Sequence, residues 1–473
     1  MQRCIKVIKP SKNNFQDINW KKLSLYGILV LAFILRLTSI LIPNIGEWDE
    51  RFHALVAKNL MRNPFRPSLI TDGLCTLDPL DWSLCDIWFA KPPLALWSMM
   101  FSMEIFGVNE FGLRFPSLIF SMISVLLTYW LGKHLFNEKI GLVAALLYAI
   151  NGMLLEVNIG RLAGDHVDTL FFMLFQLAVV ALLLDERRMT VKKSVLIGAI
   201  IGLSFLTKWT ASFFILIVVA MCGLIIWRNL QKVLIFTSLV IFTAVIVVLP
   251  WMWYIYHSFP VETATMVEGM FTPLTEVVQK HSGPWYYYIN SMRININELV
   301  YLPLLFLIFM VYKKRSLNTL ILFVWIMLPL LVLSYSATKR EVYLLMSATP
   351  IFISIAYFLH VSMRLSKGSR WRPWIKFLYF LVIVAAIRYS IERIKPMQIT
   401  FAKPQFRIEM ETILKNSTSP SDSIILVNDP HYLEARFYYD MLGYRYLSTA
   451  KIDSLSAMGY TVFSFNKGAY HPY

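Results

Sequence analysis

The chain has 473 residues, of which 57% are hydrophobic and 16% charged, with a mean hydropathy of +0.57 and a formal net charge of +16. A soluble domain averages about 25% charged residues, so this chain has too few charges to cover a globule of its length. Its 19 Gly, 21 Pro and 4 Cys exclude collagenous, disordered and disulfide-scaffold proteins. A polytopic membrane protein remains. In that class a basic excess indicates which side of the membrane a loop occupies, rather than nucleic-acid binding.

Eleven apolar runs approach the roughly 20 residues that a bilayer-spanning helix needs. The first begins near Leu23 and no small-residue cleavage site follows it, so we expect an anchor and not a signal peptide. A further run at 94–107 is apolar enough to be another span or a re-entrant helix, so about 11–13 transmembrane helices are expected. The predicted spans are 24–43, 113–132, 140–158, 167–184, 194–209, 211–227, 233–254, 299–312, 318–336, 342–362 and 374–390.

Basic residues concentrate in alternate connections between these spans. Cytoplasmic loops collect Lys and Arg, so the alternation predicts a cytoplasmic N-terminus and a C-terminus on the opposite face. The basic segments are the N-terminal tail and the connections at 133–139, 187–193, 228–232, 313–315 and 364–376.

The segments on the opposite, outer face include three long ones, at 44–112, 255–298 and 391–473. The first two contain Trp, Tyr and Pro, as is typical of interfacial helices. The third predicts a small α/β appendage with a strand at 423–428, a helix at 429–442 and a strand at 460–465. We therefore expect an all-α membrane domain over residues 1–390 and a small outer-face α/β domain over residues 391–473.

Two cysteines, Cys75 and Cys85, lie in the first outer segment. An oxidising compartment would allow a disulfide between them, and the sequence leaves this open. No CxxC or Cys/His metal pattern occurs.

Charged residues on the outer side of the membrane boundary are the candidate functional groups, because charge there is costly unless it is used. Residues 46–62 (GEWDERFHALVAKNLMR) predict an interfacial amphipathic helix that Asp49 could open as its N-cap. Asp49 and Glu50 could also serve only to cap this helix and favour its positive end. In the same way, Lys91 in WFAKPPLALW could be a snorkelling lysine at a helix start.

Two later clusters add to this set. Arg161, Asp165 and Asp168 in GRLAGDHVD also fit an ordinary polar hairpin between spans. Lys339 and Arg340 in TKREVY oppose the tendency of cations to lie on the cytoplasmic side, so a purely structural reading is weaker there.

Carboxylates beside cations at a lipid–water boundary suit the transfer of a group from a phosphate-bearing lipid. A carboxylate can accept a proton from an acceptor hydroxyl, while Lys and Arg stabilise charge on a departing phosphate. An ion-coupled transporter would also carry boundary carboxylates, although transporters usually hold their charges near the midplane and often show two related halves. No internal repeat is evident here.

The order of these motifs resembles the integral-membrane glycosyltransferases of the GT-C fold, in particular the protein O-mannosyltransferase and aminoarabinose (lipid A) transferase superfamily. The similarity runs from about residue 24 to residue 365. Its motifs are WDERFHALVAKNL at 48–60, AKPPLALW at 90–97, FGLRFPSLIF at 111–120, RLAGDHVDTLFF at 161–172, LPWMWYIY at 249–256, HSGPWYYYI at 281–289 and KREVYLLMSATP at 339–350.

The resemblance implies a polyprenyl-phosphate sugar donor and inversion at the anomeric carbon. Asp49 matches the acid held to be the catalytic base or its organiser, with Glu50 beside it. The second acid is Asp168 or Asp165. The remaining roles implied are donor-phosphate binding by Lys91, Lys339, Arg340 and Arg161, and substrate binding by Tyr343, His281 and His53.

One position departs from the aminoarabinose transferases, where a glutamate before the lysine helps to hold a metal with a later histidine. Here that position is Ala90, although His281 stands in the matching place, so no metal or other cofactor is expected. The expected protein is thus an inner-membrane glycosyltransferase, with an unassigned sugar and a lipid, glycan or protein acceptor. The alternatives are a GT-C transferase using a different lipid-linked glycan donor, and a transporter or flippase of lipid-linked sugars.

Overall fold

The computed structural model describes residues 15–75, 77–79, 81–161, 165–394 and 403–473. Helices dominate this part of the chain, and eight of them are long and apolar enough to cross a membrane, or up to ten if each of two bent pairs forms one span. The membrane helices are α1 (Phe15–Ile40), α4 (Glu110–Leu135), the bent pair α5 (Glu138–Ile150) and α6 (Gly152–Asn158), α7 (Asp165–Leu183), α8 (Val191–Lys208), α9 (Ser212–Trp227), α10 (Leu230–Ser258), α14 (Tyr301–Lys314), α15 (Leu317–Tyr335), α16 (Ala348–Leu365) and α17 (Arg372–Ile394).

Helices α8 and α9 follow one another with only the 3₁₀ turn η1 (Trp209–Ala211) between them, yet they are two antiparallel spans. Ser204 and Ser212 share a side-chain hydrogen bond of 2.9 Å, whereas eight residues of straight helix would separate them by about 12 Å. The far end of α9 also returns to the start of the pair, because Trp227 Nε1 donates to the Glu186 carbonyl. With this reversal the described helices match the eleven expected spans.

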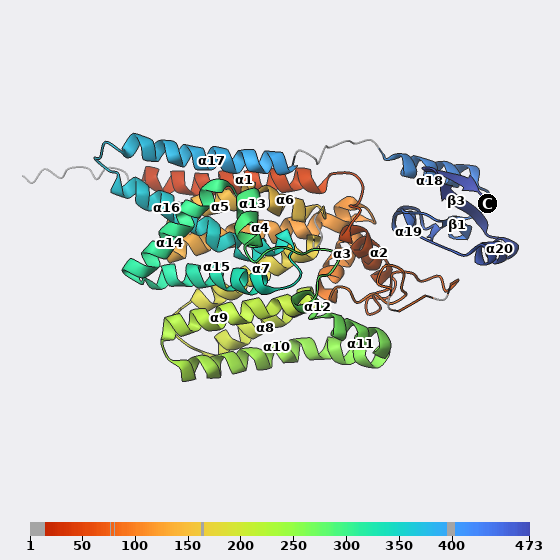
Figure 1. The fold of residues 1–473 in the computed structure, drawn as a ribbon, viewed down its shortest axis with the longest axis horizontal. Helices are drawn as coiled ribbons and strands as arrows, with labels where there is room; N and C mark the ends of the chain where they lie inside the picture. The colour runs from red at the N-terminus through yellow and green to blue at the C-terminus, as the bar shows by residue number, and fades with distance from the viewer. Residues whose placement is uncertain (1–14, 76, 80, 162–164, 395–402) are drawn as a thin grey trace, which may run out of the picture.

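The depth of each helix in the bundle follows from how much of its apolar surface is covered. In α7, 89% of the residues in the most apolar stretch of 18 are buried. The value is 83% for α16 taken together with the 3₁₀ segment η3 (Glu341–Ser347) that precedes it. The corresponding share is 17% for both α10 and α17, which lie at opposite edges of the bundle (Figure 1). The edge helices therefore present their apolar side chains to lipid, and the central ones supply the core.

Short helices connect the membrane helices, and most of them lie toward the end of the bundle nearest the C-terminal strands (Figure 1). The apolar run expected at 94–107 forms one of them, α3, a helix of 14 residues that is shorter than a bilayer span requires. Helix α14 is equally short, but it qualifies as a span together with α13, as the second bent pair. The set comprises α2 (Asp49–Leu60), α3 (Pro93–Phe106), α11 (Pro260–Gly269), α12 (Thr272–Thr275), α13 (Tyr287–Asn295) and the 3₁₀ turn η2 (Glu298–Val300).

The C-terminal segment forms the expected small α/β unit. Its sheet has the order β2-β1-β3-β4, with β1 parallel to β2 and β3, and β4 antiparallel to β3. The two predicted strands are confirmed, but the helix predicted over 429–442 is shorter because Asp440 adopts a left-handed conformation that ends it. The elements are α18 (Gln405–Asn416), the turn η4 (Ser421–Ser423), β1 (Ile424–Val427), α19 (Tyr432–Tyr439), β2 (Leu442–Gly443), α20 (Thr449–Ala457), β3 (Thr461–Asn466) and β4 (Ala469–Pro472).

Helix α19 of this unit docks on α2. Lys58 Nζ donates to the carbonyls of Arg436 and Phe437 at 2.7 and 2.8 Å and pairs with Asp440 at 2.9 Å. A cation at this place satisfies carbonyls at the end of α19 that have no helical partner. The C-terminal unit therefore contacts the helix that begins with the predicted catalytic acid.

The disulfide between Cys75 and Cys85, which the sequence left open, does not form, and both cysteines are free. The Cys85 carbonyl accepts a hydrogen bond from Ile70, which fixes Cys85 in a buried stretch of paired backbone. Cys75 lies instead beside Tyr444 of the C-terminal unit, to which it is hydrogen-bonded. The two thiols thus belong to different surroundings despite their short separation in sequence.

Candidate active site

Helix α2 carries Asp49 and Glu50 in its first turn, and its predicted apolar residues are buried. The expectation of a single apolar face is wrong, because every residue from Phe52 to Ala57 is buried and the helix is covered on all sides. The expectation that Asp49 is the N-cap is wrong. Trp48 occupies that position, Asp49 is the first helical residue, and no side-chain capping hydrogen bond forms. Its carboxylate instead receives Lys91 Nζ at 3.0 Å.

The Lys-Pro-Pro motif explains how Lys91 comes to lie there. Pro92 is the N-cap of α3 and Pro93 its first residue, where a fixed φ favours the start of a helix and the missing N–H costs nothing. Lys91 is therefore held immediately before a helix N-terminus, where the helix dipole disfavours a cation. The Asp49 carboxylate offsets that unfavourable placement.

Asp49 is held in its ionised form. Burial favours the neutral acid, but the charges of Lys91, His53 and Arg340 outweigh it and lower the pKa of Asp49 well below its usual range. His53 lies one turn further along α2, fully buried, with its ring edge-on to Trp88 at 5.6 Å. Arg340 is therefore close enough to influence Asp49, although 291 positions separate the two residues in the sequence.

Glu50 points away from this pair into a fully buried clamp. Arg114 donates to both of its carboxylate oxygens, at 2.7 and 2.9 Å, and His166 Nε2 lies 2.9 Å from one of them. The backbone N–H of Gly46 donates at 2.5 Å to the second oxygen. Burial opposes ionisation, but Arg114 and His166 lower the pKa of Glu50 to about 2.

Two neighbours shape this clamp further. Ser117 Oγ lies 2.8 Å from His166 Nδ1, so both ring nitrogens of the histidine are occupied. Gly160 packs so closely that a Cβ there would lie 2.6 Å from the Glu50 carboxyl carbon, and its φ of +67° suits glycine. The Glu50 clamp, defined as Glu50, Arg114 and His166, therefore fixes the segment that carries Asp49.

A second carboxylate–lysine pair lies where α7 begins and α8 ends. Asp168 is fully buried in α7 and pairs with Lys208, the last residue of α8. The Lys208 ammonium also lies over the rings of Tyr343, at 5.1 Å, and Phe171, at 5.8 Å. Helices α7 and α8 and the segment that carries Tyr343 thus meet at Lys208. The sequence analysis did not select Lys208, although it is a lone lysine near the end of the predicted span 194–209.

The predicted phosphate loop is pinned to the segment before α13. The backbone N–H of Lys339 donates to the His281 carbonyl at 2.9 Å, and Arg340 donates to the Gln279 side chain at 2.6 Å. Lys339 is buried and its ammonium donates to the Ser336 carbonyl at 2.6 Å. His281 is largely exposed. Its partial desolvation, together with the positive charge of Arg340, lowers the pKa of the imidazole.

The other predicted residues lie apart from Asp49. Arg161 lies 3.7 Å from Glu156, which also pairs with Arg393, and Arg393 in turn pairs with Glu341 at 3.1 Å. Asp165 begins α7, but its side chain lies outside the described part of the chain. The structure therefore brings Asp49, Lys91, His53 and Arg340 together, and it sets Asp168 with Tyr343 in a neighbouring group.

The residues around Asp49 do not suit a divalent metal. Ala90 offers no ligand atom at the position where the aminoarabinose transferases have a glutamate, and the Asp49 carboxylate is already paired with the Lys91 ammonium. Within the described ranges no group of three or more His, Cys, Asp or Glu residues has the arrangement of a metal site. We therefore assign no step to a metal.

The fold and this charged boundary site define a membrane protein of the GT-C class. The crystal structure of ArnT from Cupriavidus metallidurans bound to undecaprenyl phosphate aligns with 93% of this chain and 88% of its own, with a TM-score of 0.64 and 14% identity. An oligosaccharyltransferase from Archaeoglobus fulgidus aligns over 91% of this chain and 65% of its own, with a TM-score of 0.63 and 11% identity. At these identities the likeness concerns the fold, and it confirms the GT-C architecture.

Sequence comparisons lead to the same superfamily. A family model described as dolichyl-phosphate-mannose-protein mannosyltransferase matches residues 90–254. The undecaprenyl phosphate-alpha-4-amino-4-deoxy-L-arabinose arabinosyl transferase of Pseudomonas aeruginosa (strain LESB58) is 26% identical over 316 residues, which are 64% of this chain and 56% of the relative. A second such transferase, from Pseudomonas fluorescens (strain Pf0-1), is 24% identical over 74% of this chain and 61% of the relative.

These matches confirm the resemblance inferred from the motifs: the chain is similar in sequence to mannosyltransferases and aminoarabinose transferases, and similar in fold to GT-C glycosyltransferases. It spans somewhat more than half the length of the curated relatives. What those relatives act on comes to this chain only as a proposal.

Proposed function

We propose that this protein is an inverting membrane glycosyltransferase that moves one sugar from a polyprenyl-phosphate donor to an acceptor on the outer face of the membrane. The Asp49–Lys91 pair beside Arg340 carries the proposal, because it sets an ionised acid and two cations at the membrane boundary. The donor class follows from the relatives, whose names specify undecaprenyl phosphate-linked aminoarabinose, and from the ArnT structure that holds undecaprenyl phosphate.

In the transfer step, the bond between the anomeric carbon and the donor phosphate oxygen breaks, and its electron pair stays on the phosphate. The acceptor hydroxyl oxygen forms the new bond to the anomeric carbon from the opposite face. Asp49 accepts the proton that this hydroxyl loses. The products are a glycosylated acceptor and a polyprenyl phosphate.

Lys91 and Arg340 stabilise the phosphate as its charge grows. An ammonium has three N–H donors, so Lys91 can keep its bond to Asp49 and still donate to the phosphate. Donors already fixed in place cost little reorganisation when the charge develops, which is the main source of electrostatic catalysis. Lys339 and Arg161 remain secondary candidates for phosphate binding, because both have protein partners in this structure.

The other acids take different roles in this proposal. Glu50 acts as a positioning residue, since Arg114 and His166 occupy its carboxylate and hold the first turn of α2 in place. Asp168, with Lys208 and Tyr343, forms a second wall of the substrate site, and Asp165 is the alternative second acid. His53 and His281 complete the substrate site on either side of Asp49 and Arg340.

The protein is a multi-pass membrane protein, and we propose the bacterial inner membrane with the N-terminus in the cytoplasm. Predicted cytoplasmic connections meet at one end of the bundle, where Lys21 lies 3.5 Å from Glu138 and Asn318 bonds to the Leu135 carbonyl. Helix α2, which carries Asp49, lies at the other end, beside the C-terminal unit (Figure 1). We propose that residues 391–473 are a separate outer-face domain joined to the membrane domain 1–390.

The direct test incubates the purified protein in detergent with polyprenyl-phosphate sugars labelled in the sugar, and then separates lipid, glycan and protein products. Label should move from the donor to one acceptor fraction, with undecaprenyl phosphate released in equal amount. Transfer only from a lipid-linked oligosaccharide would move the assignment to a different donor class. Movement of intact donor across proteoliposomes without transfer would favour a flippase.

A further inference from the structure

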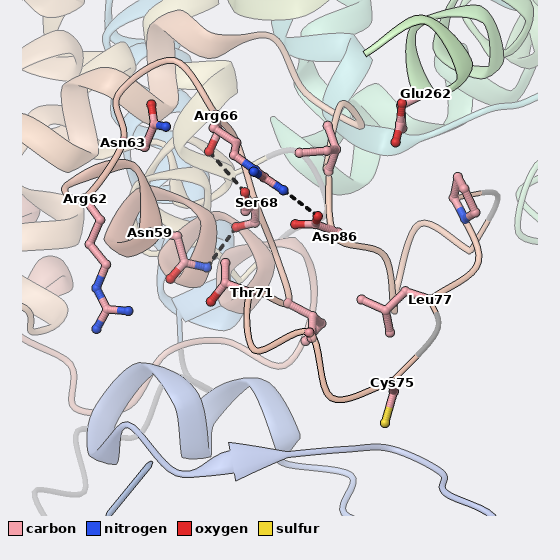
Figure 2. A pocket seen from close by; sticks show the side chains of 14 residues that line it. Asn59, Arg62, Asn63, Arg66, Ser68, Thr71, Cys75, Leu77, Asp86 and Glu262 are labelled. Carbon is pink, nitrogen blue, oxygen red and sulfur yellow. Dashed lines mark hydrogen bonds and ion pairs between the residues drawn. The ribbon is translucent and has the colours of Figure 1, made fainter. Parts of the chain in front are cut away.

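A cavity of about 620 Å³ opens on the site side of the molecule, next to the predicted reaction centre and separate from it. Its walls come from the end of α2, from the loop between α2 and α3, and from Glu262 on α11 (Figure 2). This volume lies within the usual range of small-molecule sites, roughly 300–1,000 Å³.

Hydrogen bonds hold the walls of this cavity. Asn59 donates to the carbonyls of Ser68 and Leu69 at 2.9 and 3.2 Å, and Arg66 pairs with Asp86 at 2.6 Å (Figure 2). A β-bridge between Ser68 and Ile87 joins the two strands of the loop. One wall of the cavity is thus built from paired backbone, at 67–70 and 85–88.

The side chains that line the cavity suit a polyhydroxylated ligand. They offer amides from Asn59 and Asn63, a hydroxyl from Thr71, and the guanidinium of the exposed Arg62, with a carboxylate from Glu262 on the facing wall. The two arginines and two acids of the lining balance in formal charge, which does not favour a polyanion. Amide, carboxylate and guanidinium groups together donate to and accept from neighbouring hydroxyls.

The cavity is within reach of the Asp49–Lys91 pair. Ile87 lines it and precedes Lys91 by four residues, so at most about 14 Å of chain separates them. Asn59 lies on the same helix as Asp49, ten residues further on, or about 15 Å along the axis. A short oligosaccharide bound in the cavity could place its terminal hydroxyl at the pair.

We propose that this cavity binds the carbohydrate part of the acceptor, so that the acceptor is a glycan or glycolipid whose sugars are recognised between α2, the following loop and α11. This inference rests on the proposed transferase function and specifies its substrate class. Sugar binding at the cavity leaves the donor lipid to the Asp49–Lys91 pair, so the two substrates occupy different parts of the molecule.

Among the described cysteines, Cys75 lines the cavity and is partly exposed, whereas Cys85 and Cys222 are buried (Figure 2). Cys4 lies outside the described residues and is replaced by serine in every preparation below, so that maleimide reports on Cys75. Purified protein is labelled with fluorescein maleimide, and transfer from labelled undecaprenyl-phosphate sugar to an envelope glycolipid extract is measured. We expect labelling to raise the acceptor KM at least tenfold and to leave the Kd for undecaprenyl phosphate unchanged. Thr71→Trp, which fills the cavity without chemistry, should give the same KM effect.

Two controls define the site of the effect. Cys75→Ser, compared with its own untreated activity, should not respond to the reagent. Lys367→Cys in that background carries the label on the connection between α16 and α17, far from the cavity, and should keep its transfer rate. Unchanged acceptor KM in both the labelled protein and Thr71→Trp would overturn the inference while the transferase function stands.

A binding measurement separates this inference from the proposed function. The rate at which maleimide labels Cys75 is measured with the oligosaccharide fraction released from the same extract by mild acid, and with a tryptic digest of envelope proteins. The inference predicts that the oligosaccharides slow labelling severalfold and the peptides do not, whether or not any sugar is transferred. No protection by oligosaccharide, or protection by peptides alone, would contradict it.

Discussion

Replacing Arg114 by methionine tests whether the Glu50 clamp holds the catalytic segment. Methionine keeps the apolar stem and removes the guanidinium, which donates to both Glu50 oxygens and also to the Asn44 carbonyl at 2.7 Å. Removing one partner of a buried ion pair costs about 3–5 kcal/mol, because it leaves the other charge buried and uncompensated. For a chain of this length, unfolding entropy is about 1 kcal/mol per kelvin, so an apparent Tm lower by about 3–5 °C is expected.

The dependence of this loss on pH gives the sharper result. In the parent protein the pKa of Glu50 is about 2 and lies below the usual value of 4.5, so its stabilising effect is present above pH 4.5 and is lost as the pH falls toward 2. Without Arg114, burial dominates and the pKa of Glu50 rises above 4.5. The variant should therefore gain stability as the pH falls from 7 to 5, where the parent shows little change from this group.

The assay is thermal unfolding in detergent at several pH values, with sugar transfer measured in parallel. Arg188→Met is the matched control, since its pair with Asp185 is exposed and contributes little. Glu50→Gln combined with Arg114→Met should recover part of the lost stability, because no charge is then left buried. An Arg114→Met protein with parental Tm at pH 7 and no pH effect would refute the clamp.

Three further predictions concern neighbouring contacts. Lys91→Ala and Arg340→Ala should each lower kcat/KM for the donor by an amount equivalent to about 2–4 kcal/mol, and normal donor turnover in both folded variants would remove them from phosphate binding. Lys208→Met should leave the buried Asp168 without its cation, so thermal stability should fall and the Asp168→Asn/Lys208→Met pair should recover it; additive losses would show that the two do not interact. Tyr438→Phe removes the hydroxyl that accepts from the backbone N–H of Ile45 at 2.9 Å and donates to the Glu110 carboxylate. The free energy of unfolding should fall by about 1–3 kcal/mol, and kcat should fall as well. An unchanged kcat would show that the C-terminal unit is not coupled to the site.

The sequence predicts the membrane architecture well because hydropathy and loop charge act locally. The reversal between α8 and α9 falls at the predicted boundary near Trp209, and the strands β1 and β3 coincide with short runs of β-branched and aromatic residues. Helix α19 is shorter than predicted, because no local sequence pattern indicates that Asp440 adopts the left-handed conformation that ends it.

Only part of the candidate site was predicted, and that part came from the order of the motifs along the chain. Asp49 and Lys91 stand in separate motifs 42 positions apart, and it was the order of motifs that indicated their common role. The partners of Glu50 were missed because their pairing is tertiary: Arg114 and His166 lie 64 and 116 positions away. A cation at the outer end of a predicted span is the signal that would have singled out Arg114 as well as Lys208.

The central claim is that Asp49 is the acid that works on the acceptor hydroxyl. The most direct measurement is kcat for sugar transfer by Asp49→Asn at saturating donor, with undecaprenyl phosphate binding and Tm measured on the same preparation. Since a positioned proton acceptor contributes about 10²–10⁴-fold, kcat should fall by that factor while donor-lipid binding and folding are kept. A well-folded Asp49→Asn protein that transfers sugar at the parental rate would contradict the account and move the role to Asp168 or Glu50.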